Sequence, residues 1–179
     1  MTQSYIVCAM KDEKYLSNLV GAFATSVASG IEQRISELGA RSLSAEVALV
    51  AIYNHPDETI DVLSKVLAIT HSGVVRLINT LELEGLVERL KSIRDGRAVV
   101  LRVTQSGRER VKVILKARES ATTKFLDNFD SEQKKNLLVL LEIAMGKVTD
   151  DQLQARRVCR LCNEGVCRQQ GCPVELAVK

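Results

Sequence analysis

Residues 71–90 read HSGVVRLINTLELEGLVERL, and residues 94–111 read RDGRAVVLRVTQSGRERV. In the first stretch, apolar side chains recur at three- and four-residue steps, which indicates a helix with one buried face. Gly85 is a typical helix end. From residue 86 the period changes to that of short strands, and Asp-Gly at 95–96 predicts a tight hairpin between them. The apolar positions of the helix are Val74, Leu77, Ile78 and Leu81.

Helices are expected on both sides of this stretch. Capping residues and apolar steps predict helices over 12–39, from Ser44 to 54, from Thr59 or Asp61 to 67, and from Thr70 or Ser72 to 84. After the hairpin, the helical period returns over 104–128 and again from Asp130, where we expect it to continue to about Arg157. The predicted fold is mainly α: a winged helix-turn-helix lobe with a two-stranded wing, plus N- and C-terminal dimerisation helices.

This pattern divides the chain into four expected parts. Residues 1–42 form an N-terminal dimerisation helix, 43–104 the winged helix-turn-helix lobe, 105–157 the C-terminal dimerisation helices and 158–179 a cysteine-rich tail. The long apolar stripes of the two helical parts are too extensive for a monomer of 179 residues to cover, so we expect a homodimer.

Composition narrows the class of protein. Hydrophobic residues make up 46% and charged residues 26%, as in ordinary globular proteins. No run of about 18 apolar residues exists to span a membrane, and the start shows no secretory pattern, so we expect a cytoplasmic protein. Residues 86–112 carry 8 basic and 3 acidic side chains, whereas residues 1–85 carry 6 and 10. The positive charge therefore gathers around the hairpin, where it could face a polyanion.

The order of these elements points to double-stranded DNA as the partner. The N-terminus of a capped helix can meet base edges in the major groove, and short side chains there allow close approach. A basic hairpin can reach phosphates or the minor groove. The expected DNA contacts are Thr70, His71, Ser72, Gly73, Arg76, Lys91, Arg94, Asp95 and Arg97.

The same residues resemble the MarR family of transcription regulators. The family pattern Arg-Leu-x-x-x-Leu-Glu-x-x-Gly-Leu-Val-x-Arg is matched from Arg76 to Arg89. It is followed by Asp-x-Arg at Asp95 and Arg97, and by an entry to the next helix at residues 103–107. The wing is short for the family, with only residues 91–93 before Arg94, and Ser64 stands where the family favours Ala.

The resemblance implies a transcription regulator, and we expect it to act as a repressor, with activation as the open alternative, and to have no enzymatic activity. It implies an obligate homodimer that places two recognition helices in successive major grooves of a pseudo-palindromic operator. It also implies that Arg97 contacts the minor groove while Asp95 braces it. A small-molecule effector would bind between the dimerisation helices and the DNA-binding lobe.

The resemblance does not explain the C-terminal cysteines. Cys159, Cys162, Cys167 and Cys172 lie within 14 residues, and the opening Cys-x-x-Cys is a usual chelating pair for zinc. An iron–sulfur cluster is the alternative ligand, because a final Cys followed by Pro also occurs in ferredoxin-like runs. Functional disulfides and four unliganded thiols are the remaining interpretations. Cys8 stands apart, and we expect it to be buried or merely tolerated.

Two other classes of function follow from the cysteines alone. A thiol–disulfide oxidoreductase could use Cys159 and Cys162, but the βαβ pattern that usually surrounds such a motif is absent from the predicted elements. A metal-binding protein for storage or delivery would need the tail and not the wing. With only His55 and His71 as histidines, catalysis at a histidine-bound metal is not expected.

Overall fold

The computed structural model describes residues 2–39, 41–93 and 95–178, with side chains from residue 12 onward. The winged-helix lobe consists of α2 (Leu43–Asn54), α3 (Ile60–Leu67), α4 (His71–Leu83) and a hairpin of β1 (Val87–Lys91) and β2 (Val99–Val103). The strands are antiparallel, with Val87 opposite Val103 and Lys91 opposite Val99. The predicted mainly α fold with a two-stranded wing is confirmed.

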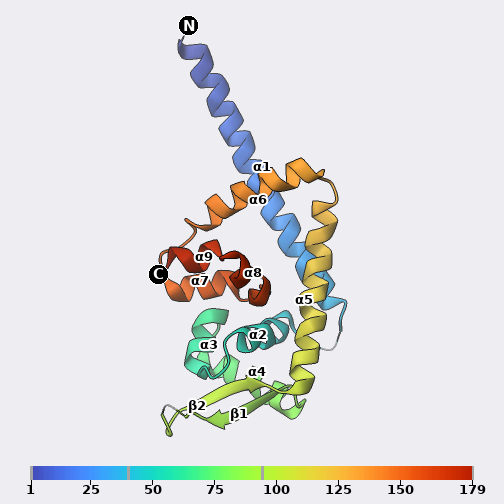
Figure 1. The fold of residues 1–179 in the computed structure, drawn as a ribbon, viewed down its shortest axis with the longest axis vertical. Helices are drawn as coiled ribbons and strands as arrows, with labels where there is room; N and C mark the ends of the chain where they lie inside the picture. The colour runs from blue at the N-terminus through green and yellow to red at the C-terminus, as the bar shows by residue number, and fades with distance from the viewer. Residues whose placement is uncertain (1, 40, 94, 179) are drawn as a thin grey trace.

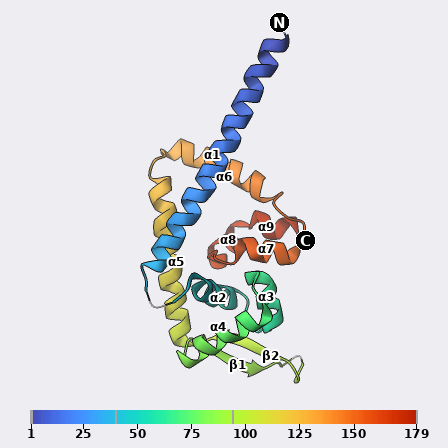
Figure 2. The ribbon, with the colours of Figure 1, turned by 180° about the vertical axis from the view of Figure 1, so that it is seen from behind.

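Two long helices rise from this lobe (Figures 1 and 2). Helix α1 (Thr2–Ser36) packs along α5 (Gln105–Leu126), and its N-terminal half projects beyond the rest of the chain. The aromatic rings of Phe23 and Phe125 lie 4.6 Å apart at this contact. Helix α6 (Ser131–Met145) crosses near the middle of α1. The first helix thus begins earlier than the predicted residue 12.

The last three helices form a small body of their own, which we call the cysteine module: α7 (Gln152–Cys159), α8 (Glu164–Gln170) and α9 (Pro173–Ala177). In both views it lies between α6 and the helices α2 and α3 (Figures 1 and 2). The expectation that the helix from Asp130 continues to about Arg157 is wrong. It ends at Met145, and Asp151 caps a new helix by accepting a hydrogen bond from the Gln154 N–H at 2.6 Å.

Local capping decides most helix starts, as predicted. Thr59, Thr70 and Thr104 each accept a backbone N–H three residues on, and Asp130 forms a capping box with Gln133. The cap of α2 is Ser42 rather than the predicted Ser44.

Two hydrophobic cores support the elements. The larger core joins α2, α3, α4, the wing and the N-terminal half of α5 around Leu49, Ile78 and Ile114. The smaller lies inside the cysteine module, around Ala155, Cys159, Cys172 and Val174. Within the described residues, no helix is both long and apolar enough to cross a membrane.

Candidate nucleic-acid interface and cysteine module

Helix α4 presents a polar N-terminus to solvent. Thr70 has extended backbone angles, and its hydroxyl accepts a hydrogen bond from the Gly73 N–H at 3.2 Å. The Ser72 hydroxyl lies 3.4 Å from the same oxygen. A Cβ on residue 73 would stand 3.1 Å from it, so a larger residue would press on the cap. The small side chains at the start of α4 therefore keep the first turn both capped and open.

The two faces of α4 are sharply divided. Val74, Ile78 and Leu81 are buried in the core, whereas His71 at the start of the helix and Arg76 on the opposite side are exposed. His71 is also 3.3 Å from a carboxylate oxygen of Asp61 on α3, a contact that the sequence analysis did not foresee. The exposed face therefore carries the residues predicted to contact DNA.

The wing places further predicted contacts on a thin projection. Lys91 and Arg97 are exposed, and the Asp95 carboxylate accepts a hydrogen bond from the Arg97 N–H at 3.0 Å. The Asp95 N–H in turn donates to the Ser92 hydroxyl at 3.2 Å. Asp95 thus braces the turn at Arg97 through the backbone, while the predicted contact Arg94 lies outside the described residues.

A bidentate ion pair anchors the base of the wing. Arg102 on β2 donates to both carboxylate oxygens of Asp57 at 2.6 and 2.7 Å. The hydrogen bond to Asp57 and its negative charge raise the pKa of Arg102 above its usual value. Glu58 and Leu101 form an isolated antiparallel bridge beside this pair, so the loop before α3 adds a third short segment to the hairpin.

Two residues of the family pattern tie α4 to the wing. The Arg89 guanidinium on β1 pairs with Glu82 and donates to the Asn79 side chain at 2.6 Å. Sequence reasoning assigned no role to this trio. The opposite charges of Glu82 and Arg89, placed on either side of the Gly85 turn, were the signal that could have revealed it.

A second contact missed by sequence reasoning lies inside the lobe. The Glu46 side chain on α2 is only 1% exposed, and Arg110 of α5 donates its Nε–H to both carboxylate oxygens at 3.0 and 3.1 Å. Arg41 lies 3.9 Å from the same carboxylate and also pairs with Glu84 at the end of α4. The signal was a single acidic residue in the otherwise apolar run of α2.

The four tail cysteines come together in the fold. Cys159 ends α7, Cys162 follows in the turn, Cys167 lies in α8 and Cys172 precedes α9. All four are free thiols, and all four line one enclosed space of about 10 Å³. In the part of the chain that the structure describes, no group of three or more His, Cys, Asp or Glu side chains is arranged so that it could hold a metal ion. The side chain of Cys8 is outside the described residues.

The thiols interact with one another and with nearby arginines. Hydrogen bonding with Cys162 and burial raise the pKa of Cys159 well above its usual value. The same hydrogen bond, with the positive charge of Arg118, lowers the pKa of Cys162 to about 7. The Arg118 Nη2 on α5 lies 4.0 Å from the Cys162 sulfur.

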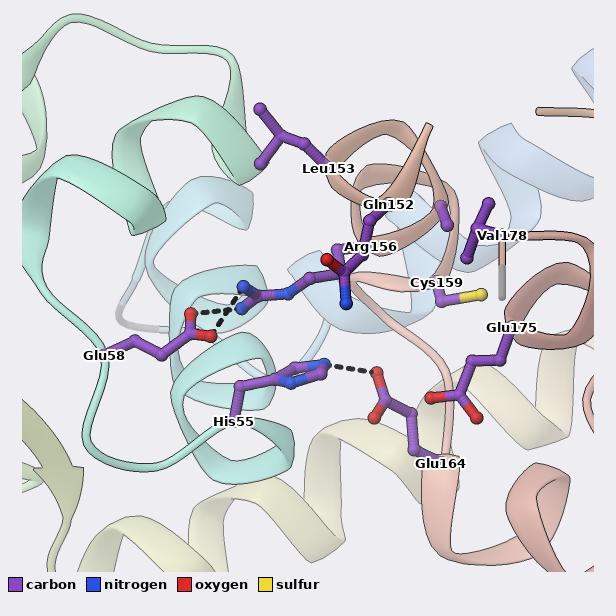
Figure 3. A pocket seen from close by; sticks show the side chains of 10 residues that line it. His55, Glu58, Gln152, Leu153, Arg156, Cys159, Glu164, Glu175 and Val178 are labelled. Carbon is purple, nitrogen blue, oxygen red and sulfur yellow. Dashed lines mark hydrogen bonds and ion pairs between the residues drawn. The ribbon is translucent and has the colours of Figure 1, made fainter. Parts of the chain in front are cut away.

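Polar contacts fasten the cysteine module to the winged-helix lobe (Figure 3). His55 Nε2 lies 3.0 Å from Glu164 Oε1, and Arg156 pairs through both terminal nitrogens with the Glu58 carboxylate. The Asn54 amide donates to the Cys162 carbonyl at 3.0 Å. Between the module and the ends of α2 and α3 lies a cavity of about 530 Å³.

Comparison with known proteins agrees with this geometry. Residues 47–98, which include α3, α4 and β1, match the model of the MarR family. Two curated relatives from Bacillus subtilis (strain 168), both named uncharacterized HTH-type transcriptional regulators, are YwhA and YdgJ. YwhA is 28% identical to this chain, over 50% of this chain and 65% of the length of YwhA. YdgJ is 30% identical to this chain, over 54% of this chain and 60% of the length of YdgJ. The matches thus span less than two thirds of each relative.

A solved structure extends the likeness beyond the lobe. Streptococcus pneumoniae FabT, in a crystal structure described as a complex with DNA, is 25% identical over 76% of this chain and 96% of its own, with a TM-score of 0.52. The names of both curated relatives describe transcription regulators rather than enzymes. The oxidoreductase alternative therefore gains no support from them. The winged-helix lobe of the chain is thus similar to that of the MarR family.

Proposed function

We propose that the chain is a DNA-binding transcription regulator that acts as a homodimer on a pseudo-palindromic operator. The observation that carries the proposal is the exposed N-terminus of α4 beside a basic wing at one end of the molecule (Figure 1). A helix N-terminus with free polar groups suits phosphates and base edges, and the wing adds positive charge next to it. The DNA complex of FabT supports the same use of this fold.

Exposed apolar surface supports the homodimer. On α1, Leu16 is 60% exposed and Val20 is 57% exposed, and no residue of α6 is buried in the single chain. Leu138, Leu140 and Ile143 leave a similar apolar face on α6. Exposed apolar faces of this extent mark interfaces, and a second copy offers the same two helices as a self-complementary partner. We therefore assign α1 and α6 to the contact between copies.

Repression is the direction of control that we propose. A dimer with two recognition helices and two wings would cover one face of its operator and exclude other proteins from that site. The cavity between the cysteine module and the lobe offers a place for a small-molecule effector, because its lining, which includes Glu58 and Arg156, connects α7 to the segment before α3.

The test begins with the full-length protein and a random duplex library. Selected sequences should contain two half-sites whose centres lie about one helical turn apart, because a symmetric dimer presents two equivalent helices. Light scattering should report a dimer at micromolar concentration, and titration should give two chains per duplex. A monomer, or binding that does not discriminate selected from scrambled duplexes, would overturn the proposal.

A further inference from the structure

We propose that Cys159, Cys162, Cys167 and Cys172 bind a single zinc ion, and that this ion fastens the cysteine module to the winged-helix lobe. The starting point is convergence: four thiols, two from α7 and α8 and two from the segments that follow these helices, line the same enclosed space. Two of them, Cys159 and Cys172, belong to the buried core of the module. Four thiolates around one ion are a standard tetrahedral zinc site.

The size of the space favours one ion. A volume of about 10 Å³ is room for roughly one water-sized sphere. A [4Fe–4S] cluster would bring eight atoms of its own between the same sulfurs, so the module would have to open to admit it. A single ion requires a smaller rearrangement of the module than a cluster does. Each cysteine has one side-chain torsion, and this is the adjustment that the proposal requires of the four sulfurs.

The charges around the space suit a tetrathiolate site. Each thiol gives up its proton to solvent when it binds the ion. Four thiolates and one Zn²⁺ together carry a net charge of −2. Arg118 lies 4.0 Å from the Cys162 sulfur, Arg160 also acts electrostatically on this thiol, and Arg168 acts on Cys172. Arg118 and Arg160 are the positive charges that offset this excess, because Arg168 is already paired with Glu164 and Glu175, whose carboxylates also line the space.

The site is joined directly to the lobe. The Cys162 carbonyl accepts the Asn54 amide at the end of α2, and Arg157 donates to the Lys65 carbonyl of α3 at 3.1 Å. An ion that fixes the turn from Cys159 to Cys162 therefore holds the groups that contact both helices. An effect of the ion on operator affinity rests on the proposed function, because α3 immediately precedes the recognition helix α4.

Metal content gives a test that does not depend on DNA. The full-length protein is purified anaerobically without chelators, and elemental analysis should show about one zinc per chain. Replacement of zinc by Co²⁺ should give thiolate-to-cobalt charge-transfer absorption. Cys162→Ser and Cys167→Ser should lose the metal, whereas Cys8→Ser, which removes the one cysteine outside the module, should keep it.

Hydrogen exchange tests whether the ion holds the cysteine module on the lobe. Because it uses the wild-type protein, it gives an answer even if the cysteine variants fail to fold. Chelation of zinc from the wild-type protein should accelerate exchange in residues 152–178 and in α2 and α3, and added Zn²⁺ should reverse the change. Iron with inorganic sulfide, or four titratable thiols and no metal, would overturn the zinc site. Exchange that chelation does not change would overturn the fastening. A zinc-loaded dimer that ignores every duplex would refute only the proposed DNA function.

Discussion

His55, the residue that ends α2, lies with its Nε2 3.0 Å from the Glu164 carboxylate at the start of α8, although 109 residues separate them in the chain. The Glu164 side chain is 8% exposed and also pairs with Arg168 in its own helix. A carboxylate this far from water requires partners, since an unpaired buried charge is costly. One of its partners belongs to the lobe, so the carboxylate keeps its contact with His55 only while the module is docked.

Removal of the imidazole should therefore loosen the cysteine module. In His55→Ala, Glu164 loses its partner on the lobe, and local opening of residues 152–178 should become easier by about 1–3 kcal/mol. Native-state hydrogen exchange measures this free energy segment by segment. Glu32→Ala, at an exposed position on α1, is the control and should leave it unchanged. Equal protection in His55→Ala and the wild type would show that the contact does not hold the module.

The pair of Glu46 and Arg110 should matter more for global stability. Glu46→Ala leaves the Arg110 guanidinium, which is largely removed from solvent, without its carboxylate, and breaking one side of a buried pair costs about 3–5 kcal/mol. Urea unfolding at one fixed protein concentration measures the loss. Glu109→Ala is the control, because its pair with Lys112 is exposed and should be worth less than about 1 kcal/mol. Similar midpoints for the two variants would contradict the prediction.

The sequence predicted the elements whose causes are local. Thr59, Thr70, Thr104 and Asp130 each cap a helix within the next three residues, so their effect is visible without the fold. The end of α6 was missed because Val148 continues its apolar pattern. Helix α6 nevertheless ends there for local reasons, because Gly146 is its C-cap and Asp151 caps the next helix.

Contacts between distant segments could not be predicted in the same way. The brace of Asp95 on the Arg97 N–H spans two residues, whereas Glu46 and Arg110 are 64 residues apart and meet only because α2 packs on α5. The spacing of the four cysteines indicated a shared site. That Cys162 lies beside Arg118 follows from the docking of the module, which no local pattern specifies.

Close packing at the start of α5 makes Gly107 sensitive. A Cβ at this position would stand 2.1 Å from the Leu86 carbonyl oxygen, which is backbone and has little freedom to move. Gly107→Ala should therefore lower the free energy of unfolding by about 1–3 kcal/mol. Gly96→Ala is the control, since a Cβ there meets no atom within 4 Å, and its effect should stay within about 0.5 kcal/mol. Chemical denaturation of both variants compares them, and equal stabilities would show that the Leu86 backbone yields.

The wing should separate specific from general DNA contacts. Arg97 is held at the exposed tip by Asp95, whereas Lys91 ends β1 and is exposed at the edge of the hairpin. If the tip enters the minor groove, Arg97→Ala should weaken binding to the selected operator by about 1–3 kcal/mol. Lys91→Ala should weaken selected and scrambled duplexes alike and reduce the slope of log K against log salt by about 0.9.

Two further variants serve as controls for this comparison. Arg97→Lys keeps the positive charge but loses the planar guanidinium, so the salt slope should persist while discrimination between duplexes falls. Lys135→Ala removes a positive charge from α6, far from the wing in Figure 1, and should change neither quantity. Fluorescence anisotropy over a range of salt concentrations measures all of them. Wild-type affinity and discrimination in Arg97→Ala would exclude the tip of the wing from the interface, and an unchanged slope in Lys91→Ala would exclude its edge.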